Sequence, residues 1–249
     1  MRRSLSVAAV LLASLAWAGP AAAVPSGAAD GGAHPAVGAL VADQAYSDGT
    51  WTYCTGTLIS STVFLTAAHC GEGARVRVTF DSAYQDGDAV HAGTFHADPR
   101  YGHRQSDPHD LAVVVLDVPV TGVAPARLPA AGSLAHLPQG QRITSVGYGA
   151  YEVAQGPGGH AYRYDDVRRV STGKLNATTP AWLRVSMNAA RGDGGTCYGD
   201  SGGPNFLGTS NVLAATTVTG DAVCRATNVD YRLDTPAARS FLSPYVTLP

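Results

Sequence analysis

The sequence predicts an all-β protein with one short helix near its C-terminal end. At 249 residues, 45% hydrophobic and 14% charged, the chain is long enough to bury the core of one domain. Its 29 glycines and 15 prolines indicate many tight turns. Short runs rich in Val, Thr and Tyr lie between them, whereas helical periodicity is scarce. These observations favour strands joined by turns.

The N-terminal residues have the features of an export signal. Arg2 and Arg3 supply a positive start, residues 5–17 are apolar, and three alanines at 21–23 form a small-residue cleavage site. A membrane anchor is the alternative, but this apolar run has 13 residues and a spanning helix needs roughly 20. We therefore expect residues 1–23 to be a signal peptide, and residues 24–249 to be secreted to the extracellular space without a membrane association.

Seven further segments have the composition of strands, and one has that of a helix. The helix is expected over 236–241, with Asp234 or Thr235 as its cap and Pro236 in its first turn. The expected strands are 37–41, 55–60, 75–80, 111–116, 141–146, 182–187 and 212–219.

Charge and cysteine content exclude some classes of function. Without Arg2 and Arg3, 15 basic residues face 19 acidic ones, so nothing indicates nucleic-acid binding. Lys174 is the single lysine beside 16 arginines, a composition that we associate with a GC-rich bacterial genome. Four cysteines in an exported chain allow three disulfide pairings, and without a Cys-x-x-Cys pair we expect neither a metal site nor a cofactor. The cysteines are Cys54, Cys70, Cys197 and Cys224.

Ser201 stands out as a candidate nucleophile within Gly-Asp-Ser-Gly-Gly-Pro, residues 199–204. A serine hydroxyl needs a base to take its proton and backbone donors for the developing oxyanion, and flanking glycines let amides approach closely. The segment also matches the Gly-x-Ser-x-Gly elbow of α/β-hydrolases, in which the histidine follows the serine. All eight histidines precede Ser201, which excludes the elbow arrangement.

Two further segments supply a candidate base and a candidate orienting acid. His69 lies in Thr-Ala-Ala-His-Cys, after the apolar run at 63–65. Asp110 opens the run Asp-Leu-Ala-Val-Val-Val-Leu, where a carboxylate leads into a buried strand. Each segment alone has an ordinary structural explanation, as a buried histidine and as a turn residue.

Together, in the order His, Asp, Ser, these three motifs resemble those of the trypsin/chymotrypsin serine protease family. Gly-Tyr-Gly at 147–149 is similar to the family's Gly-Trp-Gly, and Tyr231 falls where an aromatic follows the specificity pocket. The resemblance is weakest from about residue 151 to 180.

The resemblance implies a role for each motif residue. Ser201 is the nucleophile, His69 the general base and then acid, and Asp110 the carboxylate that orients it. The amides of Gly199 and Ser201 form the oxyanion hole. The implied activity is a serine endopeptidase that hydrolyses peptide bonds through an acyl-enzyme.

The family's fold and disulfides are implied in the same way. The fold is two six-stranded antiparallel β-barrels with the active site in the cleft between them. We expect the first barrel over about 24–135 and the second over about 136–249. The implied disulfides are Cys54 with Cys70, which tethers the His69 loop, and Cys197 with Cys224.

Activation and specificity are also expectations from the resemblance. Signal cleavage after Ala23 would expose Val24, whose amine would pair with Asp200 as in the family, so no separate zymogen peptide is expected. The pocket-floor position that is aspartate in trypsin is Gly195 here, and Val229 would narrow the pocket. We therefore expect small or medium apolar residues at P1 rather than Arg or Lys. The pocket wall at 216–221 is not assigned.

Two alternative functions remain: a catalytically silent, protease-like binding protein, and an esterase on the same scaffold. For the protease, the expected partners are polypeptide substrates and protein inhibitors, and the expected state is a monomer.

Overall fold

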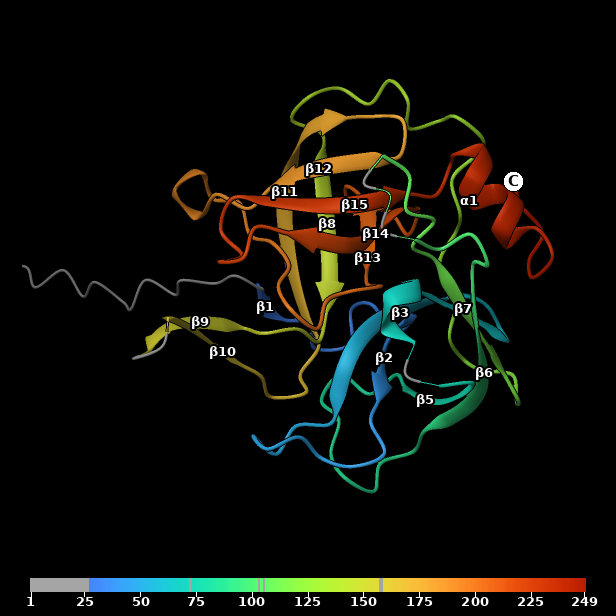
Figure 1. The fold of residues 1–249 in the computed structure, drawn as a ribbon, viewed down its shortest axis with the longest axis vertical. Coiled ribbons are helices and arrows are strands. Elements are labelled where there is room, and N and C mark those ends of the chain that lie inside the picture. Colours follow the sequence, from blue (N-terminus) through green and yellow to red (C-terminus); the bar gives the residue numbers. More distant parts are fainter. Residues whose placement is uncertain (1–26, 72, 103, 105, 157–158) are drawn as a thin grey trace, which may run out of the picture.

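The computed structural model describes residues 27–249 except 72, 103, 105 and 157–158, and it contains two closed antiparallel β-barrels (Figure 1). The first closes in the order β2-β3-β4-β7-β6-β5. Its strands are β2 (Val37–Val41), β3 (Thr52–Ser60), β4 (Val63–Thr66), β5 (Arg75–Thr79), β6 (His91–Ala97) and β7 (Ala112–Leu116).

The second barrel closes in the order β8-β11-β12-β15-β14-β13, because β11 pairs with β8. Its strands are β8 (Arg142–Gly147), β11 (Arg169–Thr178), β12 (Trp182–Ser186), β13 (Pro204–Leu207), β14 (Leu213–Gly220) and β15 (Thr227–Arg232). The prediction of two six-stranded barrels is confirmed.

Three further strands lie outside the barrel walls. β1 (Ala28–Ala29) pairs with β11 and so attaches the N-terminal segment to the second barrel. β9 (Glu152–Gly156) and β10 (Gly159–Arg163) form a separate hairpin that projects to the left in Figure 1.

Close packing in the first barrel explains two of its glycines. Gly38 and Gly56 face each other across β2 and β3. A Cβ atom on Gly56 would lie 2.4 Å from Cε1 of Phe64, and one on Gly38 would lie 2.3 Å from the carbonyl oxygen of Thr79. The Phe64 ring therefore occupies space that only glycine leaves free.

An apolar cluster joins the two barrels. Leu65 and Val113 of the first barrel share it with Val146 and Phe206 of the second, and the C-terminal helix adds Phe241. Burial of this shared surface holds the barrels against each other.

The C-terminal helix α1 (Pro236–Leu242) begins as the sequence predicts. The Thr235 hydroxyl accepts a hydrogen bond from the Ala238 amide at 3.2 Å, which makes Thr235 the cap. Asp234 instead accepts a hydrogen bond from the Leu134 amide and pairs with Arg232. In the part of the chain that the structure describes, no helix has the length and apolar character needed to cross a membrane.

Candidate active site

Strand register brings His69 and Asp110 together. β4 and β7 are antiparallel, with Thr66 opposite Ala112. The end of β4 therefore lies beside the start of β7. His69 follows in the short 3₁₀ helix Ala68–Cys70, and Asp110 comes just before β7.

The two side chains form a close hydrogen bond. His69 Nδ1 lies 2.7 Å from Asp110 Oδ2, while the backbone amide of His69 donates to Oδ1 at 3.0 Å. Asp110 is buried, and the His69 side chain is 31% exposed. Because a carboxylate only accepts hydrogen bonds, this contact assigns a proton to Nδ1, and in the neutral ring Nε2 is then the acceptor.

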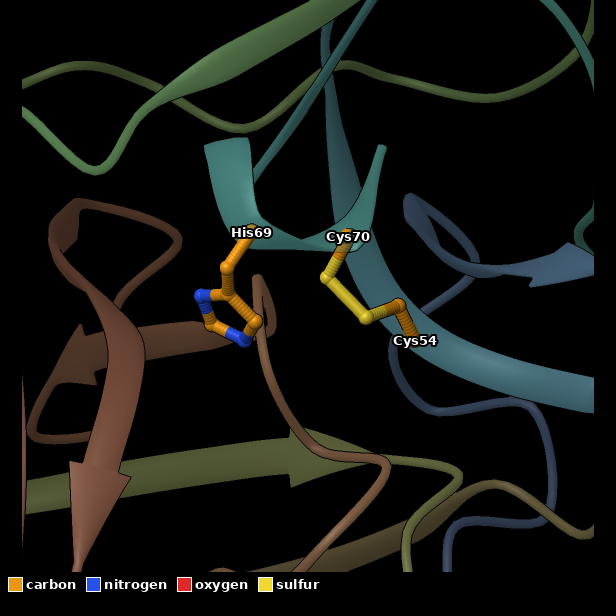
Figure 2. A group of neighbouring side chains, drawn as sticks. All are labelled: Cys54, His69 and Cys70. Atoms are coloured by element: carbon orange, nitrogen blue, oxygen red, sulfur yellow. A yellow bond between two sulfur atoms is a disulfide. The ribbon is translucent and has the colours of Figure 1, made fainter. Parts of the chain in front are cut away.

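The disulfide Cys54–Cys70 lies directly beside His69 (Figure 2). The two sulfur atoms and a His69 ring nitrogen lie within 4.8 Å of one another, a grouping that could suggest a metal site. A metal would need thiolate sulfurs, and here both sulfurs are bonded to each other. The cluster therefore anchors the histidine turn to β3.

The segment that carries Ser201 packs against the His69 turn. The Ser201 carbonyl accepts a hydrogen bond from the Thr55 amide at 2.8 Å. Gly202 has φ +80°, and a Cβ atom on it would lie 2.1 Å from Thr66 Oγ1 and 2.8 Å from the Ala67 amide nitrogen. Glycine is therefore required here both for the backbone conformation and for the close approach.

The amides of Gly199 and Ser201 are available at this turn. Neither donates a hydrogen bond to another group within the described residues. The Gly199 carbonyl accepts a hydrogen bond from the Thr55 hydroxyl at 2.9 Å, and Gly199 has φ +94°. Unpaired amides beside a serine hydroxyl can stabilise a developing oxyanion.

Asp200 is buried beneath this turn. Its Oδ1 accepts from the Gly149 amide at 2.8 Å and its Oδ2 from the Cys197 amide at 2.7 Å. Burial raises the pKa of Asp200 to about 6, although these two amide hydrogen bonds act to lower it. The carboxyl group holds the turn before Ser201 to the segment around Gly149.

His69 and Ser201 both line one pocket, with a volume of about 320 Å³. One side is formed by residues 196–198 and the other by residues 217–221 of β14 and the loop after it, and Cys224 also lines the pocket. The second disulfide, Cys197–Cys224, joins the two sides. Both predicted disulfide pairings are confirmed.

The fold agrees with comparisons to known proteins. A family model described as Trypsin matches residues 28–241. This chain belongs to the trypsin family.

Relatives in the trypsin family are distant. The chain is 32% identical over 173 residues to a trypsin of Phaedon cochleariae, covering 62% of this chain and 64% of that protein. It is 31% identical over 174 residues to the alkaline C trypsin of Manduca sexta, with 61% and 64% covered. The chain thus spans less than two thirds of these relatives. The solved structure of HL collagenase has the same fold, with a TM-score of 0.65 and 19% identity over 88% of this chain and 96% of that one.

Two residues predicted for the substrate pocket do not line this pocket. Neither Gly195 nor Val229 is among the described residues that line it. Val229 lines a different depression, together with Asp110 and Trp182. Tyr231 packs on Trp182, with ring centroids 5.6 Å apart, and donates a hydrogen bond to Asp107. Val24 lies outside the described residues.

Sequence reasoning left the pocket wall unassigned and did not identify Thr55. Thr217 accepts a hydrogen bond from the Gly202 amide at 2.8 Å, and Thr55 holds both Ser201 and Gly199. These contacts are made through backbone groups and a small hydroxyl. No motif signals them in the sequence.

Proposed function

We propose that this trypsin-family chain is a secreted serine endopeptidase with Ser201, His69 and Asp110 as its catalytic triad. The observation that carries the proposal is the 2.7 Å contact between His69 Nδ1 and Asp110 Oδ2, in a pocket that His69 lines together with Ser201. The pocket supplies a base and a hydroxyl in one place, and the orienting acid Asp110 is hydrogen-bonded to the far nitrogen of that base.

In the proposed reaction, His69 Nε2 takes the proton of Ser201 as its Oγ attacks the scissile carbonyl. Asp110 keeps the ring in the required tautomer and stabilises its cation. The amides of Gly199 and Ser201 stabilise the oxyanion, and His69 then protonates the leaving amine. Water, activated by the same histidine, releases the second product from the acyl-enzyme.

We further propose that export removes residues 1–23 and that the new amine of Val24 pairs with Asp200. Two features support this. β1 aligns the N-terminal segment along β11, only four residues after Val24. Asp200 accepts hydrogen bonds from two backbone amides but makes no ion pair within the described residues. Two disulfides are consistent with an extracellular location.

For specificity, we propose a preference for small or medium apolar P1 residues. The wall residues Thr217, Val218 and Gly220 carry no charge. Asp221 also lines the pocket, but its carboxylate accepts hydrogen bonds from the amides of its own loop, residues 225–227. This carboxylate therefore caps the loop.

The experiment is labelling of the mature protein with a serine-directed fluorophosphonate, compared with Ser201→Ala. We expect labelling to depend on Ser201, and peptide hydrolysis by Ser201→Ala to fall by roughly 10⁴–10⁶-fold. Casein and a small ester, tested side by side, separate an endopeptidase from an esterase. A folded wild-type protein that is not labelled would indicate a silent binding protein and contradict the proposal.

A further inference from the structure

Met187 lies behind the wall of the pocket that contains Ser201. It directly follows β12, is buried, and is not itself among the residues that line the pocket. Its sulfur accepts a hydrogen bond from the Thr196 amide at 3.2 Å. Its methyl carbon Cε lies 3.7 Å from the position that a Cβ atom on Gly220 would take. Since Thr196 and Gly220 both line the pocket, the Met187 side chain lies directly behind two of its lining segments.

Gly195 shows how completely this side chain fills the space. A Cβ atom on Gly195 would lie 2.1 Å from Met187 Sδ and 2.2 Å from its Cγ. The Gly195 backbone is held by a 2.9 Å hydrogen bond from the Ser171 hydroxyl to its carbonyl, so it cannot easily move away. Met187 therefore fills the space into which a side chain at position 195 would extend.

We propose that Met187 is a specificity-determining residue that closes the end of this pocket and excludes large P1 side chains. The inference rests on the proposed protease function and deepens it. Gly195 carries no charge that could select Arg or Lys at P1, and in this proposal Met187 sets how long an apolar P1 side chain can be. Replacing Met187 by alanine removes Cγ, Sδ and Cε and joins the space at Gly195 to the pocket.

The test is the P1 profile of Met187→Ala, measured with peptide substrates that differ only in Ala, Val, Leu or Phe at P1. We expect kcat/KM for Leu and Phe, relative to Ala, to rise by about ten-fold or more, because discrimination between apolar side chains of different length is of this size. Met187→Leu, which keeps the volume, should retain the wild-type ratio.

A matched control separates pocket depth from general loosening. Ile143→Ala truncates a buried side chain in the core of the second barrel, and Ile143 does not line the pocket. It should lower stability without changing the P1 ratio. If Met187→Ala does not fold, Met187→Val serves in its place. A folded variant that is labelled like the wild type but keeps the wild-type P1 ratio would overturn the inference.

A second measurement does not depend on activity. Gly195→Ala should be strongly destabilising in the wild type, because the new methyl group meets Met187, and much less so in Met187→Ala. Additive effects in this cycle would overturn the inference even if the chain proved not to be an enzyme. If the wild type shows no Ser201-dependent hydrolysis, although the effects of Gly195→Ala and Met187→Ala on stability are not additive, the result would count against the proposed function instead.

Discussion

Asp200 is buried beneath the turn that carries Ser201, and its charge depends on whether an ammonium group pairs with it. Burial raises its pKa to about 6, because two backbone amides do not replace the water that an ionised carboxylate loses. An acidic group whose pKa is higher in the folded chain than in the unfolded chain destabilises the fold when it ionises. Arg169 lowers this pKa only in part, so without a pairing ammonium the free energy of unfolding should fall as the pH rises from about 4 to above 6, by about 3 kcal/mol. A pairing ammonium would offset this loss.

This gives a test of the Val24 proposal. A mature chain that starts at Val24 should be more stable at pH 7 than one carrying an extra alanine before Val24, and it should be labelled faster by a fluorophosphonate. The difference in stability should shrink below about pH 5, where Asp200 is protonated. Urea unfolding at several pH values measures it.

The control is Asp200→Asn, in which the carboxylate is absent and the two starts should behave alike. If the chains with and without the extra alanine have the same stability at every pH while Asp200 is present, the result would contradict the ion pair. So would a secreted protein whose N-terminal sequence begins well beyond Val24.

Among the elements, the turn between β4 and its 3₁₀ helix is fixed from two sides. Strand pairing with β7 sets where the turn begins, and the Cys54–Cys70 disulfide ties its other end to β3. A turn held at both ends keeps the His69 ring in one position without a long, rigid helix beneath it.

Replacing Cys54 and Cys70 together by serine should lower the free energy of unfolding by about 3 kcal/mol, from the entropy of the closed loop. We also expect kcat to fall, because the ring of His69 is then less restricted. Urea unfolding and substrate kinetics measure the two effects.

Replacing Cys197 and Cys224 by serine is the matched comparison. That disulfide joins the walls of the pocket, so the effect should appear mainly in KM. Undiminished kcat in the Cys54/Cys70 variant would show that strand pairing and Asp110 hold His69 without the disulfide.

At the scale of the whole molecule, Arg168 connects the N-terminal segment to both barrels. It is buried and pairs with Asp30 at 2.9 Å. It also donates to the carbonyl oxygens of Val37 and Phe80 and to the Tyr148 hydroxyl. Burial alone would raise the pKa of Asp30, but hydrogen bonds from His34 and Arg168 outweigh it and lower the pKa to about 2.

Asp30→Asn should therefore destabilise the protein by about 3–5 kcal/mol at pH 7, because it leaves the Arg168 guanidinium buried without its partner. A lowered pKa stabilises the fold above the unfolded value of 3.8, and that contribution is lost as the pH falls toward 2. The difference between the variant and the wild type should shrink over this range. Urea unfolding at pH 7 and pH 3 measures it.

Asp117→Asn is the control, since Asp117 pairs with Arg75 on the surface, where both side chains are about half exposed. Asp117→Asn should change the free energy of unfolding only a little. Equal effects of the two substitutions would show that Asp30 and Arg168 do not form a net stabilising link.

The strands that the sequence predicted share a local signal. The apolar run at 111–116 corresponds to β7, and the run at 37–41 to β2, because β-branched residues between turns favour strands wherever they are placed. β6 and β11 were not predicted. Their exposed and polar residues, such as those of Arg169–Thr178, form strands only because neighbouring strands supply hydrogen-bond partners.

The sequence alone determined the family and the three candidate catalytic residues, because short motifs carry the resemblance to the trypsin family and need no structure to be seen. Only the tertiary structure decided what forms the pocket around Ser201. Val229 faces a different depression, and Met187 occupies the space in front of Gly195. These outcomes depend on strand register and on the packing of side chains far apart in the chain, and neither leaves a local pattern in the sequence.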